Sequence, residues 1–399
     1  MRTSLGMVLL VAAACTPARP SFVLSDVEYA RGAESGEPNL TPTDDGGALL
    51  TWLEPVADGR HALRVVHRGA DGWGPAITVR ESDRFFVNWA DFPSALELAD
   101  GTWLVHWLEK VSPATYAYHV NVAVSTDRGS TWSVPIVPHR DTSFTEHGFV
   151  SMVRAGRDRA GLIWLDGRDM NPSGELHDRG AMTVRFTTVR RDGTLGEEAL
   201  LDARTCECCT TSLVSTESGL VAAYRDRSME EIRDIVVVRL VDGRWTEPML
   251  VGDDRWHYPG CPVNGPQLSA VGDTVALAWF AAPEQQARVQ VAFSTDGGAT
   301  FGLPLRVDDG RPSGRVDIEL LADGSAVVAW LELTDADAEV RARRVTRHGS
   351  MDPSWLVAPT QESRGSGFPR MTRVGDELLF AWRLVGPDGG IRVAAARME

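Results

Sequence analysis

Four of the five cysteines of the chain stand in two short stretches, RTCECCTTS and YPGCPVNGP. The first stretch holds Cys206, Cys208 and Cys209, and the second holds Cys261. Four clustered cysteines would either form disulfides, which persist in oxidising compartments, or bind a soft metal ion as thiolates. Both chemistries require the two stretches to meet in the folded chain.

The residue types leave both chemistries open. Adjacent cysteines bond each other only through a strained link, so a disulfide from Cys208 or Cys209 to Cys261 is expected. A thiolate site formed by all four cysteines would take copper or zinc, and His257 or His147 would complete the ligand set. A redox-active disulfide or an unpaired thiol is the third possibility.

The balance of charge excludes one class of partner. The 399 residues include 55 acidic and 40 basic side chains, for a net charge of −15. Nucleic acid is therefore not an expected partner, because phosphate binding needs a basic surface. Lys110 is the one lysine of the chain, so the basic side chains are almost all arginines, which hold carboxylates through paired hydrogen bonds.

The N-terminus, MRTSLGMVLLVAAACTPARP, is typical of an export signal. A basic residue precedes an apolar run that is too short to span a bilayer, and small residues precede Cys15. Val11–Cys15 resembles the lipobox of bacterial lipoproteins, which implies acylation of Cys15 and a membrane anchor. We expect a signal peptide over 1–15, a linker over 16–21 and one domain over 22–399. The mature protein would be periplasm-facing or a surface lipoprotein of the outer membrane, with plain secretion as the alternative.

A short apolar strand ending in an aromatic residue recurs seven times, as in ALLTWLE, AGLIWLD and AVVAWLE. Glycine-bearing turns precede most copies, and alternating strands such as VNVAVS follow. Short antiparallel strands repeated in this way predict an all-β fold, a β-propeller of four-stranded blades. Seven blades are expected, with six as the alternative. The recurring rings are Trp52, Trp107, Trp164, Tyr224, Trp279, Trp330 and Trp382.

The seventh unit ends at IRVAAARME without an outer strand. The stretch FVLSDVEYAR, near the start of the domain, would supply that strand and close the ring, which removes exposed sheet edges.

Two stretches carry a family resemblance. STDRGSTW (Ser125 to Trp132) and STDGGATF (Ser294 to Phe301) resemble the Asp-box, or BNR repeat, of sialidase-like propellers. In that motif the aspartate and glycine form a tight turn between the outer strands, and the aromatic ring packs into the blade. The resemblance implies the fold and places these turns away from the ligand face.

In a propeller the inner strands begin at the ligand face, and the loops after the second strands return there. We expect both positions to collect the functional side chains. The inner-strand starts give Asn88, Asp91, Glu146, His147, Cys206–Cys209, Cys261, Asn264, Arg315, Asp317 and Arg370. The return loops give Glu54, Glu109, Asp166, Arg168, Asp169, Arg225, Asp226, Arg227, Glu332 and Arg383.

The resemblance to sialidases implies a three-arginine clamp for a carboxylate, a tyrosine nucleophile paired with a glutamate, and an aspartate acid or base. The arginine-isoleucine-proline motif that usually supplies the first arginine is missing here. A triad would come from Arg225 or Arg227, Arg315 or Arg370, and Arg383. The tyrosines near loops are Tyr116, Tyr118 and Tyr258.

The sequence therefore predicts an exported propeller that binds a small polar or anionic ligand, such as a glycan, in its central funnel. If it is an enzyme, Asp91, Glu146 or Asp169 acts as acid or base. A copper or zinc protein and a non-catalytic surface binding module are the two competing hypotheses. The expected catalytic set is Asp91, Glu146, Asp169, Arg225, Asp226, Arg227, Arg370 and Arg383, and the expected ligand-binding set is Arg168, Asn264 and Arg315.

Overall fold

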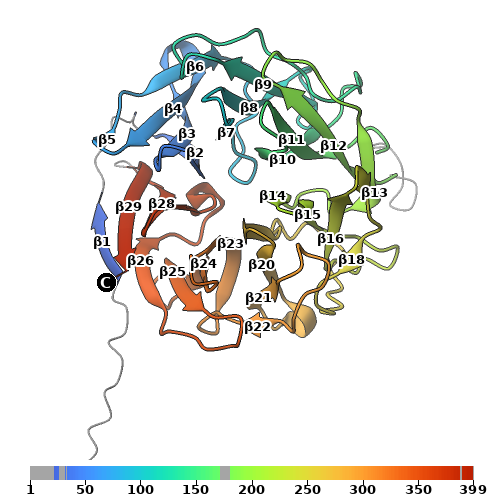
Figure 1. Cartoon of the computed structure of the whole chain (residues 1–399), viewed down its shortest axis with the longest axis vertical. Helices are drawn as coiled ribbons and strands as arrows, with labels where there is room; N and C mark the ends of the chain where they lie inside the picture. Colours follow the sequence, from blue (N-terminus) through green and yellow to red (C-terminus); the bar gives the residue numbers. More distant parts are fainter. Residues whose placement is uncertain (1–21, 27–31, 33, 171–179, 387–388, 399) are drawn as a thin grey trace, which may run out of the picture.

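Seven antiparallel sheets surround one axis in the computed structural model, which describes residues 22–26, 32, 34–170, 180–386 and 389–398 (Figure 1). The prediction of a seven-bladed β-propeller is confirmed, and the six-bladed alternative is wrong. No helix in these residues is both long and apolar enough to cross a membrane. The predicted signal peptide, the linker and the lipidation at Cys15 lie outside the described residues.

The blades are numbered 1 to 7 along the chain, and each runs outward from its inner strand. Blade 1 contains β2 (Gly36–Pro42), β3 (Ala48–Pro55), β4 (His61–Gly69), β5 (Gly72–Trp73) and β6 (Ile77–Ser82). Blade 2 contains β7 (Ser94–Glu97), β8 (Trp103–Lys110) and β9 (Tyr118–Ser125). Blade 3 contains β10 (His147–Arg154), β11 (Arg159–Asp166), β12 (Met182–Arg190) and β13 (Ala199–Thr205). Blade 4 contains β14 (Ser212–Thr216), β15 (Gly219–Arg225), β16 (Ile235–Val241), β17 (Arg244–Trp245) and β18 (Met249–Leu250).

Blade 5 contains β19 (Gln267–Val271), β20 (Thr274–Ala281), β21 (Arg288–Ser294) and β22 (Leu305–Arg306). Blade 6 contains β23 (Pro312–Leu320), β24 (Ala326–Leu333), β25 (Ala338–Val345) and β26 (Trp355–Thr360). Blade 7 contains β27 (Arg370–Val374), β28 (Glu377–Leu384), β29 (Gly390–Met398) and, as its outer strand, β1 (Phe22–Asp26). Three short 3-10 turns complete the described elements: η1 (Ala57–Gly59), η2 (Pro283–Gln285) and η3 (Arg364–Ser366).

The ring closes through its first and last strands. Strand β1 pairs antiparallel with β29, from Phe22 opposite Met398 to Asp26 opposite Ala394. The N-terminal stretch therefore supplies the outer strand that the seventh unit lacks, as predicted. This pairing leaves the last blade without an open outer edge at β29.

The aromatic ring on each second strand is buried between blades. On three of these strands a carboxylate two residues further on accepts a hydrogen bond from the indole, because residues i and i+2 share one face of a strand. The bond is 2.9 Å from Trp52 to Glu54, 2.8 Å from Trp164 to Asp166 and 2.6 Å from Trp330 to Glu332. The acidic residues at the ends of these strands, which we predicted to face the ligand, therefore stabilise the blades to which they belong.

The two Asp-box stretches form the same turn. In the first, Ser125 Oγ accepts from the Gly129 amide at 2.7 Å, and Asp127 accepts from the Thr131 amide and hydroxyl at 2.8 and 2.7 Å. The second repeats these bonds at 2.9, 2.9 and 2.6 Å. Gly129 has a φ of 85°, a conformation that favours glycine. Both turns follow the third strand of a blade and lie at the end of the ring opposite the inner-strand starts.

Side chains of the inner strands connect each blade to the next. Ser151 on β10 accepts from the Leu213 amide at 3.0 Å, and Ser212 on β14 accepts from the Leu268 amide at 2.9 Å. Asp317 on β23 accepts from the Met371 amide at 2.6 Å. The inner strands belong to different sheets and do not pair with one another, so these bonds satisfy backbone donors that face the next blade.

Candidate functional site

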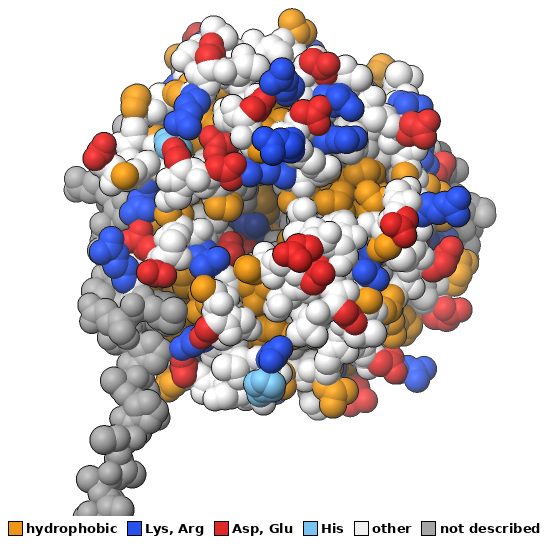
Figure 2. Space-filling model, viewed as in Figure 1, with side chains coloured by type: hydrophobic (Ala, Val, Ile, Leu, Met, Phe, Trp, Pro, Cys, Tyr) orange, Lys and Arg blue, Asp and Glu red, His pale blue; other side chains and the backbone are white. Residues whose placement is uncertain are grey.

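A polar cavity of about 190 Å³, which we call the channel, lies at the centre of the ring. It is lined by all seven inner strands or the residues just before them. Figure 2 shows one face of the molecule hollowed at its centre, with charged side chains of both signs around the hollow. The charged side chains that line the channel are Asp91, Asp317, Glu319 and Arg370.

Burial raises the pKa values of the acids that line the channel. Burial raises the pKa of Glu319 to about 8, and Asp317 adds to that rise. Burial also raises the pKa of Asp317 above its ordinary value, although Arg370 opposes the change. Arg370 donates through Nε to Asn39 at 3.0 Å, while its buried Nη1 has no hydrogen-bond partner among the described residues. Arg370 is the predicted site residue that retains an unused donor at the channel.

A second group of side chains lies where the inner strands begin, an end of the ring that we call the funnel face. The hydroxyl of Tyr118 on β9 donates to Glu146 at 2.6 Å. Asp91 accepts from the Phe149 amide at 2.7 Å and lies close to both, since its charge acts on both groups. The structure thus brings together the predicted acids Asp91 and Glu146 with one of the three loop tyrosines.

The two acids of this group differ in exposure. Asp91 is 4% exposed, and burial raises its pKa from 3.8 to about 8, with a further rise from the charge of Glu146. Glu146 is partly exposed, and burial of its remaining surface raises its pKa to about 7. Tyr118 is 1% exposed and stacks on Phe86 at 3.9 Å, so its hydroxyl reaches Glu146 from inside the protein. Glu146 is therefore the most exposed member of the group, whereas Asp91 lines the central channel.

The predicted three-arginine clamp is not formed, because its members serve structural contacts. Arg225 is fully buried, and its three nitrogens donate to the carbonyl oxygens of Asn264, Arg233 and Phe280. Arg315 donates to the carbonyl oxygens of Ser363 and Gly367 and to the hydroxyl of Ser366.

Two further arginines of the expected clamp form ion pairs. Arg227 pairs with Glu231 at 2.6 Å and with Glu207, and Arg383 pairs with Glu37 at 3.0 Å. The pair of Arg383 and Glu37 lines a separate cavity of about 330 Å³ between blades 7 and 1. Neither pair lies free to clamp a carboxylate in the channel.

Four further predicted residues are dispersed. Arg168 makes a two-pronged contact with Asp166 at 2.7 Å and pairs with Glu198 at 2.8 Å. Asn264 accepts from the Arg315 amide at 2.7 Å and so connects two blades. Asp226 accepts from the Arg227 amide at 2.7 Å, and burial raises its pKa to about 6. Asp169 is exposed and lies 3.5 Å from Arg185.

The cysteines form two disulfides, Cys206–Cys209 and Cys208–Cys261. The predicted bridge to Cys261 is present and joins the segment before β14 to the segment before β19. Disulfide sulfurs are not thiolates, so this state offers no thiolate metal site. His147 lies instead among other histidines and acids, and His257 is exposed and pairs with Ile232. Copper or zinc binding by the reduced cysteines stays a prediction.

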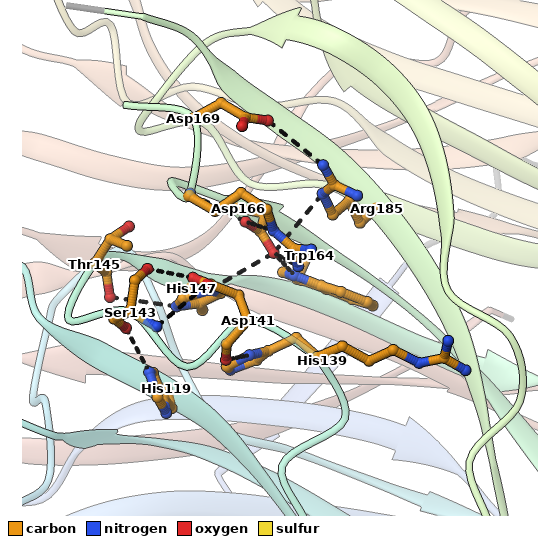
Figure 3. Close-up of polar contacts among 12 residues, drawn as sticks. His119, His139, Asp141, Ser143, Thr145, His147, Trp164, Asp166, Asp169 and Arg185 are labelled. Carbon is orange, nitrogen blue, oxygen red and sulfur yellow. Dashed lines mark hydrogen bonds and ion pairs between the residues drawn. The ribbon is translucent and has the colours of Figure 1, made fainter. Parts of the chain in front are cut away.

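A cluster of imidazoles that the sequence did not indicate lies at the funnel face of blades 2 and 3 (Figure 3). It contains His119 on β9, His139 and Asp141 in the following loop, and His147 at the start of β10. Asp166, at the end of β11, lies on the other side of His147 in Figure 3. The three histidines come from separate elements without a known spacing, so only the fold brings them together.

No family model and no curated protein matches the chain. Solved structures match over most of its length. A polysaccharide lyase described as an ulvan lyase bound to -[GlcA(1-4)Rha3S]- matches with a TM-score of 0.60 and 11% identity, over 92% of this chain and 95% of its own.

An α-L-arabinofuranosidase of Fusarium graminearum matches with a TM-score of 0.51 and 13% identity, over 91% of this chain and 93% of its own. The NanB sialidase of Streptococcus pneumoniae matches with a TM-score of 0.47 and 10% identity, over 88% of this chain and 83% of its own. At these identities the likeness concerns the fold alone.

Proposed function

Because the chain has the sialidase-like β-propeller fold, we propose that it binds a carbohydrate at the funnel face and acts on it through Glu146 as a general acid or base. The observation that carries the proposal is the bond from the buried Tyr118 hydroxyl to the carboxylate of Glu146, a partly exposed residue. A catalytic carboxyl group needs such a partner to fix its orientation and must still reach the ligand.

The likeness of folds supports the class of ligand. The ulvan lyase and the arabinofuranosidase share the ring over more than nine-tenths of this chain, and both are named for carbohydrate substrates. Fold alone does not fix a reaction, so the choice between hydrolysis, elimination and simple binding rests with the residues at the funnel face.

The charges of this chain favour a neutral carbohydrate over a strongly anionic one. Four of the arginines expected to hold a carboxylate donate to backbone carbonyls or pair with glutamates. The net charge of −15 also repels polyanions at long range. Arg370, with one unused donor, remains available for a single polar or anionic group of a mainly neutral ligand.

The test is a panel of neutral and anionic polysaccharides offered to the full chain, with binding measured by calorimetry and turnover by release of reducing or unsaturated ends. We expect binding of a neutral member and turnover that Glu146→Gln lowers by about 100-fold or more. Glu217→Gln is the matched control, because Glu217 is exposed in the turn at the opposite end of blade 4. Equal turnover in both variants would exclude Glu146 as the acid or base.

A non-catalytic binding module is the second candidate, and the paired arginines favour it. It predicts that the full chain binds a polysaccharide without turnover and that Glu146→Gln changes affinity alone. Absence of binding across the panel would exclude both candidates.

Export with lipidation at Cys15 completes the proposal. The two disulfides support it, since disulfides persist mainly outside the cytoplasm. Fractionation of cells that express the full chain or Cys15→Ser tests it. We expect the native chain in the membrane fraction and the variant in the soluble exported fraction; equal distribution of the two would contradict a lipid anchor.

A further inference from the structure

The three histidines of the cluster share one pattern of hydrogen bonding. Nδ1 of His139 lies 2.9 Å from the Asp141 carbonyl oxygen, and Nδ1 of His147 lies 3.3 Å from the carbonyl oxygens of Tyr118 and Thr145. Nε2 of His119 lies 2.9 Å from the Ser143 carbonyl oxygen. A carbonyl oxygen only accepts, so Nδ1 of His139 and Nε2 of His119, which make the two short contacts, carry a proton.

The second nitrogen of a singly protonated ring is an acceptor that can hold an ion. One ring nitrogen of each histidine lies within 4.8 Å of one ring nitrogen of each of the others. Nε2 of His139 and Nε2 of His147 are buried and have no hydrogen-bond partner among the described residues. Metal-binding histidines almost always show this arrangement, in which one nitrogen donates to a carbonyl or carboxylate and the other holds the ion.

His147 also faces two carboxylates through its second nitrogen. Its Nε2 lies 3.1 Å from Asp141 and 3.6 Å from Asp166. Ligand atoms about 2.1 Å from one ion lie about 3.0 to 3.6 Å from each other, so the spacing from His147 to Asp141 matches two ligands of one ion.

We propose that His119, His139 and His147 bind one divalent transition-metal ion, with Asp141, which lies 3.1 Å from His147 Nε2, as the nearest carboxylate. Zinc is the best match to imidazole and carboxylate ligands. Asp166 lies beside this site rather than in it, because its oxygens already accept from Trp164 and Arg168 at 2.7 to 2.8 Å. The site is independent of the disulfides and of the proposed function.

The metal site can be reached from solvent, but one imidazole ring must reorient before an ion can bind. Asp141 and His119 are partly exposed, so an ion can enter from solvent between them. The rings of His139 and His147 stack at 3.8 Å with 7° between their planes, so both lone pairs cannot point in plane at one ion. One ring has to turn when the ion binds. The bound ion connects β9 of blade 2 to β10 of blade 3.

The experiment uses the oxidised full chain, with free thiols blocked, stripped with a chelator and titrated with zinc and then with cobalt. We expect about one ion per chain by elemental analysis and a rise of several degrees in Tm. Cobalt should give the visible absorption of a nitrogen–oxygen site. His147→Gln and His119→Gln should each lower the affinity at least tenfold.

Two controls keep the result unambiguous. His348→Gln changes an exposed histidine outside the cluster and should leave the affinity unchanged. The double variant Cys208→Ser and Cys261→Ser should still bind one ion, which excludes the cysteines as ligands. His119 is only partly buried, so His119→Gln remains interpretable even where His147→Gln fails to fold. No zinc-dependent shift in Tm, or full binding by both histidine variants, would overturn the proposal.

Discussion

The hydroxyl of Tyr118 donates to Glu146 Oε1 at 2.6 Å, which fixes a partly exposed carboxyl group from inside the protein. Tyr118 lies on the last strand of blade 2 and Glu146 directly precedes blade 3, so this bond also joins two blades. Chemistry at the funnel face and cohesion of the ring therefore depend on the same contact.

Tyr118→Phe should remove this bond without changing the packing of the ring on Phe86. We expect a loss of about 1 to 2 kcal/mol in the free energy of unfolding, because Glu146 loses its buried donor. Chemical denaturation measures this loss. An unchanged midpoint would mean that Glu146 finds another donor, and Phe86→Leu, which disturbs the stacking but keeps the hydroxyl, serves as the comparison.

Asp91→Asn should change how stability depends on pH. The folded protein keeps Asp91 protonated up to about pH 8, whereas the unfolded chain releases that proton near pH 4. Between these values the folded state binds more protons, so the free energy of unfolding contributed by this group falls as pH rises.

Asparagine cannot ionise and still accepts from the Phe149 amide. From pH 5 to pH 8 the variant should therefore lose less stability than the native chain, by on the order of 2 to 4 kcal/mol. Denaturation curves at four pH values measure the difference. Parallel curves for the two proteins would show that Asp91 is ionised in the folded state.

The two disulfides should contribute unequally to stability. Cys208 and Cys261 are 53 residues apart, whereas Cys206 and Cys209 are 3 apart. Chain-entropy arguments give about 4 kcal/mol for the long loop and about 1.5 kcal/mol for the short one. Paired serine replacements of each bridge, compared by denaturation without reductant, test this order. A larger loss for the short bridge would contradict it.

Glu332→Ala should destabilise blade 6 by leaving a buried indole donor unpaired. Glu332 is 5% exposed and accepts from Trp330 at 2.6 Å and from the Arg311 amide at 2.5 Å. We expect a loss of about 2 to 3 kcal/mol in the free energy of unfolding. Glu339→Ala, which removes a partly exposed partner of Arg341, should cost less than about 1 kcal/mol. Similar losses of stability in the two variants would mean that the hydrogen bond from the Trp330 indole contributes no more than an exposed ion pair.

The architecture was predictable because each blade repeats its own signals. The second strand of a blade can be recognised from its aromatic residue alone, as at Trp52, Trp164 and Trp330. The two Asp-box turns can be recognised from Asp127 and Asp296, because these turns are stabilised by hydrogen bonds within the motif. The closing strand followed from counting strands, since a seventh blade with three strands needs one more from elsewhere in the chain.

The site could be predicted only in part, because a side chain at the end of a blade can point either toward the ligand face or into the protein. Glu146 turns its carboxyl group toward the funnel face, whereas Arg225 at an equivalent end points inward to backbone carbonyls. Sequence position does not distinguish the two. His119 and His139 escaped notice for a related reason: their neighbours come from other strands, and none of them stands at a motif spacing.

The pairing of Phe22 with Met398 determines where on the ring a tether or a fusion partner would be attached. The first and last described strands lie side by side at the outer rim of blade 7 (Figure 1). A tether attached there would hold the disc by its edge and would leave the funnel face unobstructed. Fusion partners or labels joined at this rim should accordingly be tolerated without screening the funnel face.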